Sequence, residues 1–222
     1  MKKAVNKPLT DRTFRKAVEL CLEHDPVNGL FNVEPYGKMP DWDVSNVTYM
    51  SFAFQYASDF NGNISKWDVS NVTNMAFMFH KAADFNQKIG DWDVSSVTDM
   101  SFAFQEALSF NQNISNWDVS RVTDMAWMFY EAAAFNQKIS DWDVSKVTNM
   151  QGMFGDVSDF NANIRKWDVS QVTNMEYMFN LATSFNQDLK KWDVSKVSKH
   201  TFFKANTPAW TLPKPNFNPL NK

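Results

Sequence analysis

An aspartate that recurs every 25 residues, between a tryptophan and a valine, offers the most suggestive chemistry in the chain. If equivalent positions stack, the carboxylates form a row that could collect calcium, which takes several oxygen ligands, or a basic ligand. The structural alternative is that each carboxylate accepts hydrogen bonds from nearby Ser, Thr or backbone N–H groups. Because every unit keeps the aspartate while other positions vary, we favour the structural role and keep metal binding as the alternative. The metal candidates are Asp68, Asp93, Asp118, Asp143 and Asp168.

Catalytic chemistry has little support in the sequence. The three histidines, His24, His80 and His200, share no repeat position, and no Ser-His-Asp or Cys-His pairing follows from the spacing. No phosphate-binding glycine loop is present. The single cysteine, Cys21, excludes an intrachain disulfide framework and a multi-cysteine zinc site, and its apolar neighbours predict a small buried side chain. We therefore expect a protein that is not an enzyme and needs no cofactor.

The element that positions these side chains is a repeat. The tetrapeptide Trp-Asp-Val-Ser occurs seven times at a spacing of 25 residues, which is typical of a stacked repeat architecture. The tryptophans are predicted to pack on one another as a structural ladder inside the stack. The ladder comprises Trp67, Trp92, Trp117, Trp142 and Trp167.

Within each unit the apolar spacing changes. Trp67-Asp68-Val69 alternates between apolar and polar residues, as a short strand does, while Met75, Phe79 and Ala82 follow a helical spacing. The predicted fold is therefore an α/β solenoid: a right-handed stack of strand, turn and short helix units whose strands form one parallel sheet.

Three regions follow from this pattern. Residues 1–38 are predicted to be a lead-in and a capping helix, because Phe14, Ala17, Val18 and Cys21 lie on one helical face after a possible N-cap at Thr10. Residues 39–196 form the repeat solenoid. Residues 197–222 contain a degenerate last unit and a proline-rich tail, which we expect to close the stack.

The repeat also resembles a known family. The order Ile-x-x-Trp-x-Val is similar to the strand of leucine-rich repeats, and the segments FNQNISNWDVSRVTDM (110–125) and MFYEAAAFNQKISDWDVS (128–145) resemble the BspA-like repeat of bacterial surface proteins and mycoplasma lipoproteins. The resemblance extends from Met39 to about Ala205. It implies a leucine-rich-repeat-like solenoid used for adhesion or protein binding. A recurring asparagine is similar to the asparagine ladder of leucine-rich repeats: Asn86, Asn111, Asn136 and Asn161.

The resemblance implies a cell-surface or secreted location. Residues 1–8 lack the apolar run of a signal peptide and the sequence contains no lipobox, so we leave the location open. The net charge of −3 gives no overall basic field, and we expect no nucleic-acid partner and no direct insertion into a membrane.

Specificity must come from positions that vary while the repeat is kept. The residue after Trp-Asp-Val-Ser is such a position, and its members are predicted to bind a partner: Asn71, Ser96, Arg121, Lys146, Gln171 and Lys196. The sequence favours a non-catalytic protein-interaction or adhesion-type module, or a structural subunit of an assembly, whose partner is another protein or a cell-surface macromolecule. The alternative is a calcium- or carbohydrate-binding surface domain that uses the aspartate column.

Overall fold

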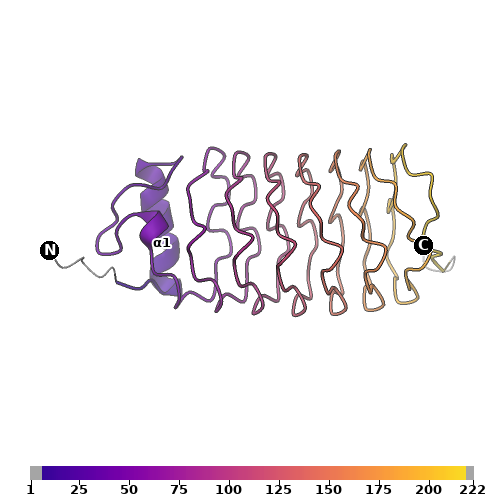
Figure 1. Ribbon diagram of the computed structural model, residues 1–222, viewed down its shortest axis with the longest axis horizontal. Helices are drawn as coiled ribbons and strands as arrows, with labels where there is room; N and C mark the ends of the chain where they lie inside the picture. The colour runs from indigo at the N-terminus through magenta and orange to yellow at the C-terminus, as the bar shows by residue number, and fades with distance from the viewer. Residues whose placement is uncertain (1–6, 219–222) are drawn as a thin grey trace.

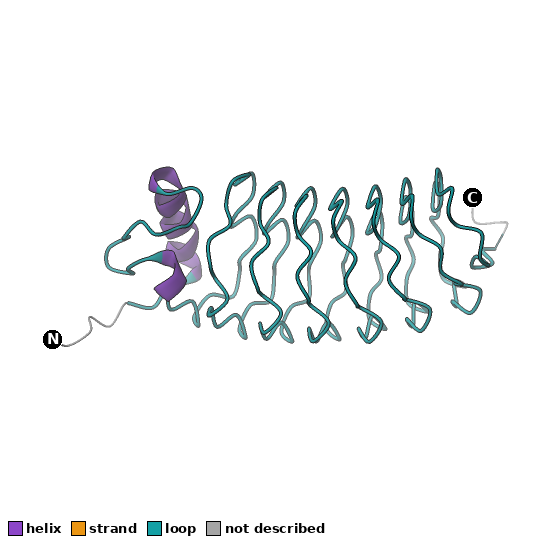
Figure 2. Cartoon of the chain, turned by 45° about the horizontal axis from the view of Figure 1, so that its top comes forward, coloured by secondary structure: helices purple, strands orange, loops and turns teal. Residues whose placement is uncertain are grey.

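The chain folds into a row of similar coils stacked along one long axis, with an α-helix at the N-terminal end (Figure 1). The computed structural model describes residues 7–218. Helix α1 spans Asp11–His24, and a short 3-10 helix, η1, spans Met39–Asp41 just before the first tryptophan of the repeat. The remaining described residues form turns, bends and extended segments, so the 25-residue units are built without regular helices (Figure 2).

The predicted α/β solenoid with a parallel sheet is wrong. Among residues 7–218, neighbouring units share only isolated parallel bridges, such as the one between Asn74 and Asp99, and no sheet forms. The expected strand at Trp67–Val69 is interrupted on both sides. The Trp67 amide donates to the Ile64 carbonyl and the Val72 amide to the Val69 carbonyl, so a three-residue turn closes each end of the extended run. Two turns leave too few extended residues for a hydrogen-bonded ladder.

The short helix expected at Met75–Ala82 is also absent. Its place is taken by a segment that we call the turn ribbon, which is residues 74–82 in the second unit and the equivalent residues of the others. Within the ribbon the amides of Met78 and Ala82 donate to carbonyls three residues earlier, whereas the amides of Phe77 and Lys81 donate to the following unit. Phe77 and Lys81 have φ of 59° and 61°, in the left-handed region that an α-helix excludes.

These alternating bonds explain why the spacing resembled that of a helix. A three-residue turn, like a helical turn, places residues three and four apart on the same side, so Met75, Phe79 and Ala82 are buried in either conformation. What differs is the direction of the other amides. Half of the ribbon's N–H groups bond along the long axis, and four such bonds join each pair of successive ribbons.

The tryptophan column lies inside the stack, with every member buried. Trp67 and Trp92 stack with ring centroids 6.5 Å apart and planes within 1° of parallel. Each indole N–H also has a backbone partner: Nε1 of Trp117 donates to the Ile89 carbonyl of the preceding unit at 3.0 Å. Phenylalanine pairs such as Phe79 and Phe85, 3.9 Å apart, fill the space beside this column. The result is one continuous apolar core through all units.

The asparagine column joins the units at their return turns. Oδ1 of Asn61 accepts the amide of Asn86 at 3.0 Å, and Oδ1 of Asn86 accepts the amide of Asn111 at the same distance. The pattern continues through Asn136, Asn161 and Asn186. A side chain thus satisfies a backbone donor that the tight turn would otherwise leave without a partner.

The helix predicted near the N-terminus is confirmed as α1, which begins directly after Thr10 and buries Phe14, Ala17, Val18 and Cys21. Burial raises the pKa of the Cys21 thiol to about 11. Helix α1 is bonded to the first unit through the Asp11 carboxylate, which accepts from the Thr48 amide and hydroxyl at 2.7 Å each. None of the helices in residues 7–218 has the length and apolar character needed to cross a membrane.

Candidate interaction surfaces

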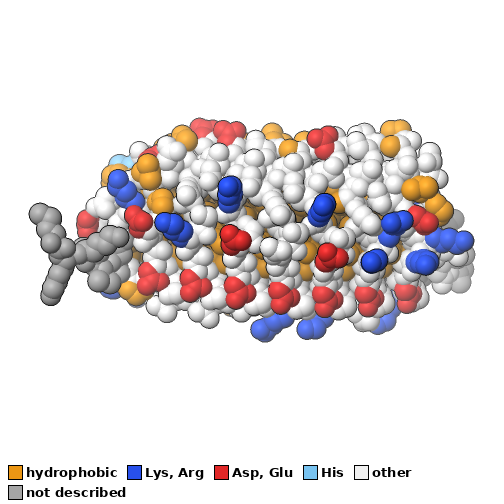
Figure 3. Space-filling model, viewed as in Figure 1, with side chains coloured by type: hydrophobic (Ala, Val, Ile, Leu, Met, Phe, Trp, Pro, Cys, Tyr) orange, Lys and Arg blue, Asp and Glu red, His pale blue; other side chains and the backbone are white. Residues whose placement is uncertain are grey.

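The aspartate column is exposed in every unit, and acidic side chains recur in a row along the long axis in the view of Figure 3. Each carboxylate accepts a bond from the serine two residues later. Oδ1 of Asp68 accepts from the Ser70 amide at 3.1 Å and from the Ser70 hydroxyl at 2.6 Å. These bonds, the hydroxyl first, hold the pKa of Asp68 below its usual value, and serines do the same for Asp118 and Asp143.

Acid should therefore weaken the protein through this column. A carboxyl group whose pKa is lowered by folding stabilises the protein above its unfolded pKa of about 3.9, and this stability is lost as the pH falls through the folded pKa. We expect Asp68→Ala to lower the free energy of unfolding by about 1 kcal/mol at pH 7, from the two lost hydrogen bonds, and by much less near pH 2. Urea unfolding at several pH values, followed by circular dichroism, measures both.

Ser70→Ala is the matched control, because it removes the hydroxyl donor and keeps the amide. At pH 7 its free energy of unfolding should fall by less than that of Asp68→Ala. Near pH 2 its difference from the wild type should likewise become small. A loss for Asp68→Ala that did not change with pH would contradict a role for the carboxylate charge.

The variable column predicted from the sequence is on the surface. Asn71, Arg121, Lys146, Gln171 and Lys196 are exposed, and Ser96 is half-buried. Three of its members are bonded to neighbouring units. Asn71 Nδ2 donates to the Ser45 carbonyl at 2.8 Å, and Lys196 Nζ donates to Oε1 of Gln171 at 2.6 Å. The column runs three residues after the aspartates, so Arg121 and Lys146 place positive charge near the acidic row in the middle units.

The structure also places on the surface an aromatic column that the sequence reasoning did not select. It lies at the first left-handed position of each turn ribbon and comprises Phe52, Phe77, Phe102, Trp127, Tyr177 and Phe202, all with φ between 55° and 63°. Neighbouring rings stack along the axis: Phe77 lies 4.9 Å from Phe52 and 4.3 Å from Phe102. All six side chains are partly or largely exposed, up to 56% for Phe202.

One unit lacks an aromatic residue in this column and has Gly152 instead, at φ 61°. The Trp127 ring extends over this glycine, so that a Cβ atom at residue 152 would overlap the indole. The same ring reaches Tyr177, two units further on, with centroids 6.0 Å apart. The larger side chain thus bridges the gap and keeps the aromatic column continuous. The sequence did carry a signal for this: Gly152 occupies a column of aromatic residues and directly follows Trp127, the one tryptophan of that column.

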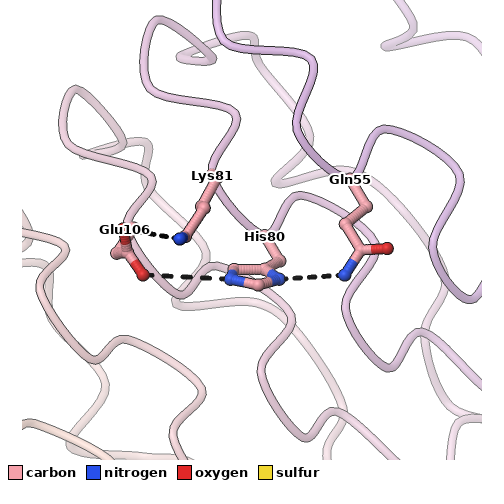
Figure 4. Close-up of polar contacts among 4 residues, drawn as sticks. All are labelled: Gln55, His80, Lys81 and Glu106. Carbon is pink, nitrogen blue, oxygen red and sulfur yellow. Dashed lines mark hydrogen bonds and ion pairs between the residues drawn. The ribbon is translucent and has the colours of Figure 1, made fainter.

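A polar cluster around His80 connects three successive units (Figure 4). Nδ1 of the buried His80 ring lies 3.1 Å from Gln55 Nε2, and its Nε2 lies 3.8 Å from Glu106, which also pairs with Lys81 at 3.6 Å. Desolvation lowers the pKa of His80, although Glu106 acts in the opposite direction, and the ring is neutral at neutral pH. Because Gln55 donates to Nδ1, the ring proton lies on Nε2, facing Glu106. The two polar partners of the ring come from the unit before it and the unit after it, so the cluster bridges three units.

The part of the chain that the structure describes contains no cluster of side chains that could bind a metal ion. No three His, Cys, Asp or Glu side chains among residues 7–218 come close enough together to hold an ion. The five candidate aspartates, Asp68 to Asp168, belong to successive units. Each accepts a hydrogen bond from the serine two residues later in its own unit.

Comparison with known proteins gives one match. No curated protein and no solved structure matches the chain. A family model described as "Mycoplasma protein of unknown function, DUF285" matches twice, over residues 28–137 and 109–211. The two matches overlap, and together they span the repeat units and part of each end. The chain therefore belongs to this mycoplasma family of repeat proteins.

Proposed function

We propose that the protein is a non-catalytic interaction module that binds another protein along its aromatic column. The observation that carries the proposal is that this column is both continuous and exposed. Phe52 and Phe202, at its two ends, are 37% and 56% exposed, and the stacked rings between them leave a partly apolar strip on the surface. Aromatic residues are enriched at protein interfaces, and extended apolar patches on a surface mark interaction sites.

The stacking geometry favours a protein partner over a carbohydrate. A sugar ring is bound by an aromatic side chain when it lies against an open ring face. Both faces of Phe77 are covered, by Phe52 on one side and by Phe102 on the other, with interplanar angles of 12° and 6°. The interior rings therefore offer their edges outward, and ring edges suit apolar and aromatic side chains of another protein.

The resemblance of the repeat to that of BspA-like surface proteins supports an adhesion-type role or a role as a structural subunit in an assembly. In this proposal the variable column supplies the polar rim of an interface and adjusts specificity. Its changes of charge, from Asn71 and Ser96 to Arg121 and Lys146, would distinguish partners that meet different parts of the stack.

The test is to remove the aromatic edges without disturbing the backbone. Asparagine tolerates the left-handed conformation, so the triple variant Phe52→Asn, Tyr177→Asn and Phe202→Asn should keep the fold. We expect this variant to lose at least about tenfold in affinity for a partner captured by the wild-type protein, because three aromatic contacts are removed and the loss of one commonly costs about 1 kcal/mol. Quantitative affinity capture followed by calorimetry with the purified partner gives the comparison.

The matched control changes three apolar residues of similar exposure away from the column, Val27, Leu30 and Leu108, to asparagine. It should bind within about twofold of the wild type, because scattered apolar side chains contribute little. Equal losses in the two triple variants, or none in the aromatic one, would rule out the column as the binding surface. A second variant, Arg121→Ser with Lys146→Ser, tests the polar rim in the same assay.

A further inference from the structure

The last turn ribbon presents a row of backbone N–H groups that have no acceptor among residues 7–218. At the junction before it, four amides donate to the next unit at 2.8–3.0 Å. These donors are Met175, Tyr177, Phe179 and Leu181, and the acceptors are the carbonyls of Lys199, Thr201, Phe203 and Ala205. The equivalent amides of the last ribbon belong to His200, Phe202, Lys204 and Asn206, and none of them donates to a described carbonyl. We call this row the C-terminal edge.

Three of the four residues of the C-terminal edge have exposed side chains among the residues that the structure describes. Phe202, Lys204 and Asn206 are exposed, and Lys204 replaces the buried phenylalanine of every earlier ribbon. Two neighbouring hollows of about 300 and 560 Å³ border the edge, and Lys204 and Lys214 line both of them. The first is mainly apolar, with Phe202 and Phe217 in its wall.

An unsatisfied side chain lines the first hollow. Nε2 of His200 is buried and has no hydrogen-bond partner among the described residues, and the ring stacks on Phe217 at 4.4 Å. Buried polar atoms are nearly always paired, so an unpaired nitrogen beside four amides that have no acceptor among residues 7–218 indicates a site that a ligand completes.

Positive charge is concentrated at the same end. Residues 189–218 contain six lysines and one carboxylate, that of Asp193, although the whole chain has a net charge of −3. The lysines are Lys190, Lys191, Lys196, Lys199, Lys204 and Lys214. Donor amides and lysines together favour a ligand that is rich in acceptors and negatively charged.

We propose that the C-terminal edge binds an acidic peptide segment of another protein. The segment adds to the end of the stack in the place that a further turn ribbon would occupy. Backbone carbonyls of the segment accept from the amides of the edge, an apolar side chain enters the hollow beside Phe202, and carboxylates pair with Lys204 and Lys214. Addition of a chain to an unpaired backbone edge is a common mode of peptide recognition. The proposal shares only Phe202 with the aromatic column, and the lysine variants that test it leave that column unchanged.

A second copy of the chain is a poorer occupant. Two C-terminal edges both present donors and cannot pair with each other. The opposite end of the stack is covered by α1: Asp11 is bonded to Thr48, Phe14 packs on Trp67 with centroids 5.6 Å apart, and Arg15 lies 5.9 Å from the Phe52 ring. A head-to-tail contact would require α1 to move away from the first unit.

A suitable probe exists within the chain itself. Residues 98–107, TDMSFAFQEA, accept four amide bonds from the preceding ribbon, and their Glu106 pairs with Lys81. The probe is this decapeptide with both ends blocked, and its neutral control carries Asp99→Asn and Glu106→Gln. Binding to the isotope-labelled full chain is measured by amide NMR shifts and by fluorescence anisotropy of the labelled peptide.

We expect the acidic peptide to shift the amides of Phe202, Lys204 and Asn206. Its affinity should fall about tenfold for the Lys204→Glu variant, since an attractive charged contact becomes a repulsive one. Lys138→Glu makes the same change of charge at an exposed lysine of the fourth unit, and its affinity should stay within about twofold. Thermal melting verifies that both variants fold.

Four results would overturn the proposal. The first is no shift of the edge amides at about 1 mM peptide, a concentration at which even a weak site is half filled. The second is equal binding of the neutral peptide, and the third is equal weakening by the two lysine variants, which would indicate unspecific attraction. The fourth is a concentration-dependent dimer in sedimentation velocity that shifts the same amides and resists the peptide, which would assign the edge to a second copy.

Discussion

Replacing Trp117 with alanine is expected to lower the free energy of unfolding by about 3–5 kcal/mol. The side chain is only 3% exposed and stacks on Trp142 with centroids 6.5 Å apart and planes within 4° of parallel. Its removal leaves a cavity that neighbours in both directions cannot fill. It also leaves the buried Ile89 carbonyl without the indole N–H that donates to it at 3.0 Å. Urea unfolding followed by far-ultraviolet circular dichroism measures the loss.

Trp127→Ala provides the comparison, because it removes the same side chain from a half-buried position. Its cost should be nearer 1 kcal/mol, as is usual for substitutions outside a packed core. Trp117→Phe should lie between the two variants, since it keeps one ring in the column but loses the second ring and the N–H donor. A loss for Trp117→Ala no larger than that for Trp127→Ala would show that the column does not carry the stability of the stack.

Gly152→Ala should be the next most damaging single change, at about 2–4 kcal/mol, although it adds only one carbon atom. The cost has two parts: a left-handed φ of 61° that alanine adopts with strain, and overlap of the new Cβ with the Trp127 indole. Thermal melting together with urea unfolding gives the difference from wild type.

A double-mutant cycle separates these two parts. In a Trp127→Ala background the overlap is gone, so Gly152→Ala should then cost only the backbone part, about 1 kcal/mol. Gly152→Ala costing the same in both backgrounds would mean that the indole moves aside without loss, and that the aromatic column is not held in place at this unit.

The sequence predicted which side chains are buried more accurately than it predicted the secondary structure. Burial of the tryptophans and the location of α1 both follow from the spacing of apolar side chains, and the structure shows both. The assignment of Trp67–Val69 to a strand was wrong because the pattern of buried residues does not indicate which groups the backbone N–H and C=O groups bond to. An extended run of three residues between two tight turns has the same alternation as a short strand.

The turn ribbon was beyond sequence reasoning for a related reason. A left-handed backbone is normally recognised from glycine or asparagine, yet here it is adopted by Phe77, Lys81 and Glu131. What stabilises it is the set of amide bonds to the next unit, a tertiary effect that no single unit contains. Among the left-handed positions of the ribbons, only Gly152 and Asn206 are of these residue types. The polar bridge at His80 was missed similarly, because Gln55 and Glu106 lie 25 and 26 residues away from it.

The direction of the ribbon bonds determines how the molecule would respond to mechanical load. They run along the long axis, four at each junction, and each junction joins only adjacent units. Tension applied between the two ends would therefore be carried by these junctions in series, so that extension begins where the bonding is weakest and proceeds one coil at a time. Each released coil would add 25 residues of slack, and the chain would act as a stepwise extensible tether, with its remaining coils still folded.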